Sequence, residues 1–283
     1  MLGDYVILCL AAVLAGAVNA IAGGGTLLTF PALFAALGSS GAAAVVANAT
    51  STVALVPGAI AALAGYRNEI RQERRWATLL VVPSLIGGLV GSLLLVLMPG
   101  ESFKTAVPWL ILTAALLFAL QPRIARWTGV TPRSSGDRDV GGEGAASETA
   151  STRALPHAPG LLAAVVSFQF LVAIYGGYFG AGIGILMLSA LAIMGMHDIH
   201  RMNAVKVLLN LMINGVSVVV FVASGKVYWP YAAAMAVSSS VGGYVAAHAA
   251  KRANKTVIRS IIVVIGFGLA AYYFYRQFAG YWK

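Results

Sequence analysis

The chain has 283 residues, of which 59% are hydrophobic and only 10% are charged, and its formal net charge is +10. Soluble domains carry roughly a quarter charged residues, so this composition excludes an ordinary water-soluble protein. The positive charge does not indicate nucleic-acid binding, because the basic residues gather in the segments 67–75, 123–138 and 251–259. Short basic loops of this kind are typical of the cytoplasmic side of a membrane protein.

The first apolar run follows Met1-Leu2-Gly3-Asp4, which lacks the basic start of a secretory signal, so we expect it to be a membrane segment. Runs of about 20 apolar residues, the length that crosses a ~30 Å hydrocarbon core as a helix, recur at 42–64, 77–97, 203–224 and 257–275. They show no alternation of apolar and polar residues, which favours helices over a β-barrel. The predicted fold class is all-α integral membrane, with eight to ten membrane segments.

The first half of the chain, 1–121, opens with two short apolar segments, 5–22 and 26–38, joined by glycines, and three full spans follow, the last at 104–121. The segment 122–159 is rich in Arg, Gly, Ser, Thr, Pro and acids, and it predicts a flexible cytoplasmic linker. The second half, 160–283, repeats the order, with short segments at 160–178 and 183–195.

The two halves resemble each other in sequence. Asn48-Ala49 followed by Pro83-Ser84-Leu85-Ile86-Gly87-Gly88 is echoed by Asn203-Ala204 followed by Ser238-Ser239-Ser240-Val241-Gly242-Gly243. An opening pair that crosses twice, or dips in and returns, adds an even number of crossings, so each half crosses an odd number of times. This parity places most basic loops on one side and predicts two inverted repeats, with the amino terminus outside.

Glycine-interrupted segments at matching positions of inverted repeats are typical of a transporter site near the membrane midplane. Helices that restart after Gly25 and Gly184 would present unpaired N–H groups and the positive ends of their dipoles, which suit an anion. Close helix packing is the alternative explanation for these glycines. No strand precedes them and no Gly-Lys-Ser/Thr follows, so they do not form a nucleotide-binding motif.

A second constellation is the polar face of the span 203–224, where Asn203, Lys206, Asn210 and Asn214 recur at helical spacing. Polar side chains within a span usually face the bundle interior or a cavity. For the lysine, snorkelling to the interface is the alternative, and for the asparagines it is hydrogen bonding between helices. The predicted substrate-binding residues are Asn19, Gly23, Gly24, Gly25, Thr26, Asn48, Thr52, Gly180, Gly182, Gly184, Asn203, Lys206, Asn210 and Asn214.

The acidic residues all fall in expected termini or loops, so no carboxylate is expected inside a span. This disfavours cation transport through a carboxylate site and an intramembrane aspartyl protease. The histidines show no pairing that would make a metal site, and neither a catalytic residue nor a cofactor is predicted.

The segment Asn19-Ala20-Ile21-Ala22-Gly23-Gly24-Gly25-Thr26-Leu27-Leu28-Thr29-Phe30-Pro31 resembles the opening motif of the sulfite exporter TauE/SafE family. Further similarity lies in Gly177-Tyr178-Phe179-Gly180-Ala181-Gly182-Ile183-Gly184, in Asn203-Ala204-Val205-Lys206 through Asn210, in Gly225-Lys226-Val227 with Trp229, and in Ile258-Arg259. Ala181 and Ile183 depart from an expected run of glycines. The resemblance implies a bacterial inner-membrane permease for sulfite, an organosulfonate or a related sulfur-containing anion, with no ATPase of its own.

The expected partners are therefore a small anionic substrate and the lipid bilayer, with no nucleic acid. A coupling ion, H⁺ or Na⁺, and a homo-oligomer stay open. The alternatives to a transporter are a membrane assembly or structural protein and a membrane enzyme.

Overall fold

The computed structural model describes residues 2–21, 23–38, 40–127, 159–194, 196, 198–249 and 255–279. Within these ranges the chain forms helices joined by short turns, without a strand, as the apolar runs predict. The helices are α1 (Leu2–Ile21), α2 (Thr26–Leu37), α3 (Gly41–Ala64), α4 (Arg67–Gln72), α5 (Arg74–Leu97), α6 (Gly100–Trp127), α8 (Pro159–Tyr178), α9 (Ile183–Ile193), α10 (Ile199–Ala223), α11 (Trp229–Ala249) and α12 (Lys255–Phe278).

The predicted start of the linker differs from the structure. Helix α6 continues through Pro122 to Trp127, so residues 122–127 are helical rather than linker. Proline and arginine made this stretch resemble a loop in composition, but a proline that lacks its own N–H can still be accommodated within a long helix. The rest of the predicted linker, 128–158, lies outside the described residues.

Six of the described helices are long and apolar enough to cross a membrane, and they include the segments 41–64, 74–97, 100–123 and 200–223. The other two are 3–20 and 259–278. Helix α11, which spans 229–249, is not among the six, although its 21 residues would be long enough. The shorter apolar helices lie at 26–37, 162–178 and 183–193. The chain is a multi-pass membrane protein.

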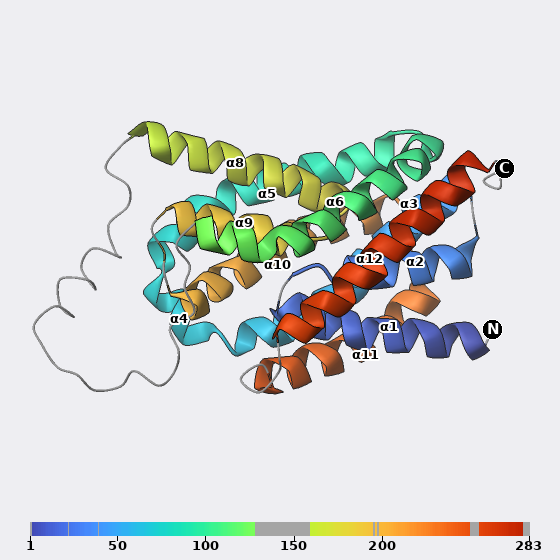
Figure 1. Cartoon of the computed structure of the whole chain (residues 1–283), viewed down its shortest axis with the longest axis horizontal. Coiled ribbons are helices and arrows are strands. Elements are labelled where there is room, and N and C mark those ends of the chain that lie inside the picture. Colours follow the sequence, from blue (N-terminus) through green and yellow to red (C-terminus); the bar gives the residue numbers. More distant parts are fainter. Residues whose placement is uncertain are drawn as a thin grey trace, which may run out of the picture.

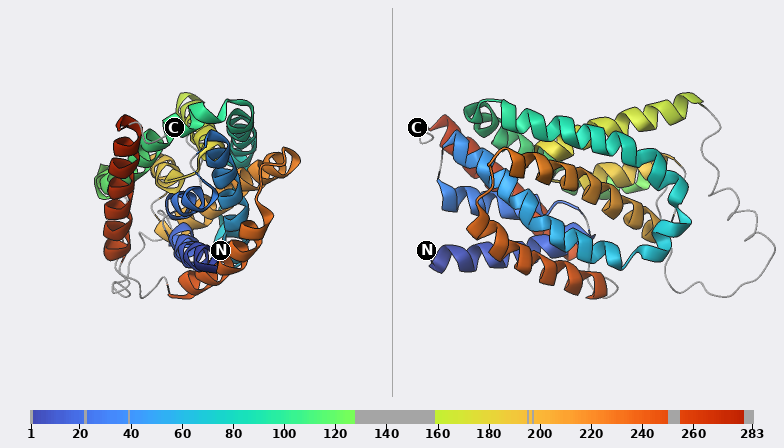
Figure 2. Two further views of the ribbon diagram at one scale, coloured as in Figure 1. Left: turned by 90° about the vertical axis from the view of Figure 1, so that its right-hand side faces the viewer. Right: turned by 180° about the vertical axis from the view of Figure 1, so that it is seen from behind.

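Each half opens with a helical hairpin that returns to the end of the molecule from which it came (Figure 1). Helices α1 and α2 enter from the end where α12 finishes, whereas α8 and α9 enter from the end where α4 lies (Figures 1 and 2). The returning helices α2 and α9 have 12 and 11 residues, which is about 16–18 Å of helix and too short for a ~30 Å hydrocarbon core. The sequence left open whether these pairs cross fully. In the structure the first helix of each pair has 20 residues, about 30 Å of helix, and only the returning helix is short.

The packing of the two halves is exchanged. Helix α1 of the first half packs against α11 of the second, and α8 of the second packs against α5 of the first. The repeated sequence motif lies at both interfaces: a methyl group on Gly242 of α11 would lie 2.0 Å from the Val13 carbonyl oxygen, and one on Gly87 of α5 would lie 2.6 Å from that of Phe170. Small residues let these helices approach closely, as in membrane bundles generally. The inverted relation of the halves stays a prediction, which this exchanged packing supports.

The core is apolar and aromatic around the start of α2. Phe30 packs edge-on against Phe103 of α6 and Phe179, with ring centroids 6.1 and 5.5 Å apart. All three side chains are buried. They fill the space between the two hairpins, so the polar groups described below lie in an apolar setting.

The described carboxylates lie toward the ends of helices. Asp4 and Glu101 are in the first turns of α1 and α6, Asp198 caps α10, and Glu73 lies between α4 and α5. The expectation that such residues occupy only termini and loops is therefore corrected, since Asp4 and Glu101 are helical and Glu69 lies in α4. None of the described carboxylates lies in the middle of a candidate span.

Candidate functional site

The two glycine breaks touch each other inside the bundle. A methyl group on Gly23 would lie 2.9 Å from the Cα atom of Gly184, and one on Gly24 would lie 3.1 Å from the backbone nitrogen of Gly182. Gly24 is also closed off by Phe118 of α6, whose ring would lie 2.7 Å from that methyl group. The chain can make this contact only because neither break carries side chains there. We call this contact the glycine junction.

The backbone at the junction adopts conformations that favour glycine. Gly23, Gly24, Gly180 and Gly182 have φ angles of 70°, 149°, 82° and 79°. Helices α2 and α9 start immediately afterwards, and neither start has a side-chain cap. The first N–H groups of a helix have no partner within it, so both helices direct positive partial charge to this region.

The predicted polar face of α10 meets the first break. The Asn210 side-chain amide donates to Asn19 Oδ1 at 3.4 Å, and the Gly24 backbone N–H donates to the same oxygen at 3.3 Å. Asn214 continues the chain by donating to Asn210 Oδ1 at 3.1 Å. Asn19 lies two residues before the end of α1. It therefore joins α10 to the first break, a role that helical spacing within α10 could not show.

Lys206 is buried within the protein. Its side chain is 1% exposed, and its Nζ donates to Asn203 Oδ1 at 3.1 Å. A methyl group on Gly23 would lie 3.9 Å from Lys206 Cδ, so the lysine stem runs beside the glycine junction. This position differs from that of a lysine that snorkels along the protein surface.

Asn48 and Thr52 of α3 lie at the second break rather than the first. The Asn48 amide donates to the backbone carbonyl of Tyr178, the last residue of α8, at 3.0 Å. The Thr52 hydroxyl donates to the Asn48 backbone carbonyl at 3.0 Å. Asn48 is 1% exposed, and its Oδ1 atom has no hydrogen-bond partner among the described residues.

The remaining predicted residues also lie at the breaks. Thr26 begins α2 and is 7% exposed, and its hydroxyl would lie 3.6 Å from a methyl group on Gly180. Gly25 approaches α1, where a methyl group would lie 2.5 Å from the Ala15 carbonyl oxygen. The predicted set thus forms two neighbouring groups, one at each break. Their role in binding stays a prediction.

The family model for the sulfite exporter TauE/SafE family matches residues 8–273. The chain belongs to this family. The chain is also similar to curated bacterial proteins. A probable membrane transporter protein of Haemophilus influenzae is 26% identical over 261 residues, which cover 92% of this chain and 90% of the relative. Probable membrane transporter protein ORF9 of Sinorhizobium sp is 24% identical, with 93% and 89% covered. Probable membrane transporter protein YfcA of Escherichia coli K12 is 26% identical, with 94% and 87% covered. No solved structure matches the chain.

Two residues of this TauE/SafE chain were missed by the sequence analysis. The Tyr175 hydroxyl donates to the Ala181 backbone carbonyl at 2.8 Å and so ties α8 across the second break. Tyr178 supplies the carbonyl that Asn48 holds. A tyrosine hydroxyl buried in an apolar span needs a partner, which is the only signal that could have flagged Tyr175.

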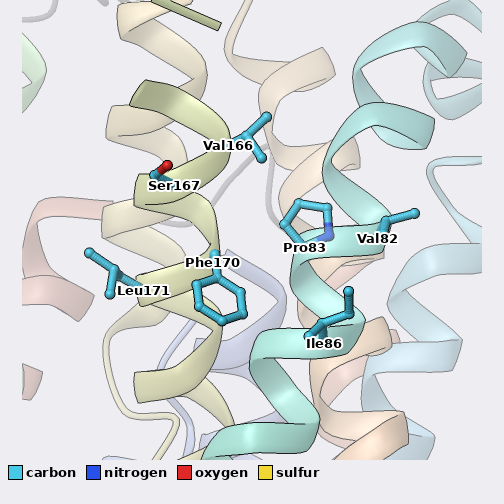
Figure 3. A pocket seen from close by; sticks show the side chains of 7 residues that line it. All are labelled: Val82, Pro83, Ile86, Val166, Ser167, Phe170 and Leu171. Carbon is cyan, nitrogen blue, oxygen red and sulfur yellow. The ribbon is translucent and has the colours of Figure 1, made fainter. Parts of the chain in front are cut away.

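An apolar groove of about 440 Å³ lies apart from the glycine junction, between α5 and α8 (Figure 3). Its lining is Val82, Pro83, Ile86, Val166, Ser167, Phe170 and Leu171. With a single hydroxyl and no charged side chain, this groove offers an anion little to replace its hydration. No group of three or more His, Cys, Asp and Glu residues that could hold a metal ion occurs in the described part of this TauE/SafE chain.

Proposed function

We propose that this TauE/SafE protein is a secondary transporter of a small anion, and that sulfite, an organosulfonate or a related sulfur-containing anion is its substrate. The binding site is the glycine junction together with the polar groups at its two breaks. The protein acts as a permease of the bacterial inner membrane rather than as an enzyme or an assembly factor.

The observation that carries this proposal is the meeting of two uncapped helix starts with a buried lysine in an apolar bundle. An anion that enters such an interior loses its hydration, and the protein must replace it with hydrogen bonds and positive potential. The starts of α2 and α9 offer backbone N–H groups, and Lys206 Nζ and Asn210 Nδ2 add side-chain donors on α10. No described carboxylate lies in the middle of a span to oppose an anion there.

The two hairpins that enter from opposite ends suggest how the site could face each side in turn. Alternating access in inverted-repeat transporters arises when one repeat rocks against the other around a fixed site. We place the amino terminus outside and α4 on the cytoplasmic side, because basic residues gather in 67–75. Labelling of cysteines introduced at 67–75 and 251–259 from each face tests this orientation, which requires both segments to react from the cytoplasmic side.

Uptake by liposomes containing the purified protein tests the function itself. We expect sulfite, thiosulfate or sulfoacetate to enter these vesicles faster than protein-free vesicles, and an imposed H⁺ or Na⁺ gradient to identify any coupling ion. Vesicles with the Gly23→Ala variant, in which the added methyl group meets Gly184, provide the matched control. If the folded wild-type protein carries none of these anions under any gradient, a structural or assembly role replaces the proposed one.

A further inference from the structure

The side-chain oxygen of Asn48 is the feature of the site that the chain itself does not satisfy. The residue is 1% exposed, and Oδ1 has no hydrogen-bond partner among the described residues. Its Nδ2 atom donates to the Tyr178 carbonyl, which fixes the orientation of the amide, because exchanging O and N would place two acceptors against each other. Buried polar atoms are almost always paired in proteins, so an unpaired one calls for a specific explanation.

Other amide oxygens of the site have partners within the chain. Asn19 Oδ1 accepts from Gly24 and Asn210, Asn203 Oδ1 accepts from Lys206, and Asn210 Oδ1 accepts from Asn214. These oxygens belong to the first break and to α10. The unpaired oxygen belongs to the second break, because Asn48 holds the carbonyl of Tyr178. Two residues after Tyr178 in the chain, Gly180 lies close to Thr26 at the start of α2.

We propose that Asn48 Oδ1 accepts a hydrogen bond from the transported ligand, and that the substrate is therefore an organic anion that carries an O–H or N–H donor beside its anionic group. This inference rests on the proposed function and narrows its substrate class. A carbonyl oxygen can only accept, so its complement on a ligand is a hydroxyl or an ammonium group. The sulfonate or other anionic group binds the helix starts at the glycine junction.

The geometry favours an extended ligand over a compact oxyanion. Helices α3 and α10 begin at opposite ends of the molecule (Figure 2), and Asn48 and Lys206 each lie seven residues after the start of their helix. At 1.5 Å per residue, each lies about 10 Å from its own end, so the two side chains are at different depths. A compact anion cannot contact both, whereas an organic anion can hold its charged group at the junction and reach Asn48 with its other end.

The test uses three probes with the same sulfonate and carbon chain: ethanesulfonate has no donor, 2-hydroxyethanesulfonate has a hydroxyl, and 2-aminoethanesulfonate has an ammonium group. Affinities are measured by calorimetry on the full-length protein in lipid nanodiscs. We expect at least one donor-bearing probe to bind about tenfold to a hundredfold more tightly than ethanesulfonate, because ethanesulfonate leaves the buried oxygen unpaired. Comparison of the two donor-bearing probes tells whether the oxygen selects a hydroxyl or an ammonium group.

Variants locate the effect. In Asn48→Ala the preference for a donor should disappear, so that the three probes bind with similar affinities. Gln169→Leu is the matched control, because Gln169 is fully buried in α8, its Nε2 donates to Ser84, and its Oε1 also lacks a described partner. This control should keep the preference. If Asn48→Ala does not fold, the three probes on the wild-type protein still decide the question.

The outcomes separate this inference from the proposed function. Equal binding of all three probes, or a preference that survives in Asn48→Ala, overturns the inference and points to a structural water at Oδ1. Transport of sulfite by a protein that binds none of the probes also overturns it and leaves the function standing. If the protein neither binds nor carries any of these anions, both the inference and the proposed function are wrong.

Discussion

The two glycine breaks are held in place by opposite chemistry. At the first break, a side-chain oxygen fixes a backbone donor, since Asn19 accepts from the Gly24 N–H. At the second break, side-chain donors fix backbone oxygens, since Asn48 donates to the Tyr178 carbonyl and Tyr175 to the Ala181 carbonyl. Two hairpins that look equivalent in sequence are therefore held differently by the rest of the protein.

Within the proposed site, we expect this difference to favour the second break as the one that faces the anion. The Gly24 N–H at the first break already donates to Asn19, so it is not available to a ligand. At the second break the Tyr178 and Ala181 carbonyls are tied to Asn48 and Tyr175, whereas the start of α9 has no side-chain cap. The second break would then supply backbone donors, and α10 would supply the charge through Lys206.

The largest effect is expected from Gly23→Ala, which acts on both breaks at once. The new methyl group would lie 2.9 Å from the Gly184 Cα, at a φ of +70°, so the breaks must separate. We expect liposome uptake to fall by at least about a hundredfold, because misplaced groups can cost that much. Gly225→Ala is the matched control, with a φ of +66° but no atom within 4 Å, so it carries only the backbone strain. Uptake by a folded Gly23→Ala protein at the wild-type rate would show that the junction is not the site.

Much of this arrangement follows from local sequence. Continuous apolar runs mark the helices, glycines mark the breaks, and the three- and four-residue spacing of Asn203, Lys206, Asn210 and Asn214 places them on one face of α10. These features depend on residues near one another in the chain. The same rule failed at Pro122, where composition suggested a loop and α6 continues.

The partners across the bundle could not be predicted. Asn48 is 130 residues from Tyr178, and Asn210 is 191 residues from Asn19, so tertiary packing alone decides that these groups meet. The repeat even suggested equivalent roles for Asn48 and Asn203. In the structure, Asn203 pairs with Lys206 on its own helix, whereas Asn48 reaches across to the second break.

Lys206→Met should have the next largest effect, because it removes the buried positive charge beside the junction while keeping most of the side-chain volume. Hydrogen bonds to charged groups are worth roughly 1.5–3 kcal/mol, so we expect anion affinity to fall about tenfold to a hundredfold. Lys104→Met is the control: Lys104 is also buried, at 5% exposure, but its Nζ lies 3.2 Å from Glu101 Oε2 in the first turns of α6. Calorimetry that found equal losses in both variants would remove the lysine from the site.

Asn210→Leu tests the scaffold role of the first break. The change removes the hydrogen bonds to Asn19 and from Asn214, and Asn19 Oδ1 keeps the Gly24 N–H as a partner, so we expect anion affinity to fall by about tenfold. Ser217→Ala is the control on the same helix, because Ser217 is buried and donates to the Ile213 carbonyl one turn before it. Thermal unfolding should show both proteins folded. Unchanged anion affinity in Asn210→Leu would reduce this asparagine to helix packing.

Tyr175→Phe should have the smallest effect and is the most direct test of the difference between the breaks. It removes only the hydroxyl that holds the Ala181 carbonyl, a neutral hydrogen bond worth about 0.5–1.5 kcal/mol, so we expect a roughly two- to tenfold loss of anion affinity. Tyr178→Phe is the control, because the Tyr178 ring packs against Phe103 and its backbone carbonyl, which the substitution keeps, is the group that Asn48 holds. If the second break presents its N–H groups to the anion, a freed Ala181 carbonyl disturbs that surface, and Tyr175→Phe weakens binding while Tyr178→Phe does not. If Tyr175→Phe instead lowers the unfolding temperature and leaves anion affinity intact, the tie at the second break stabilises the hairpin without shaping the site, and the anion must depend on α10 and the first break.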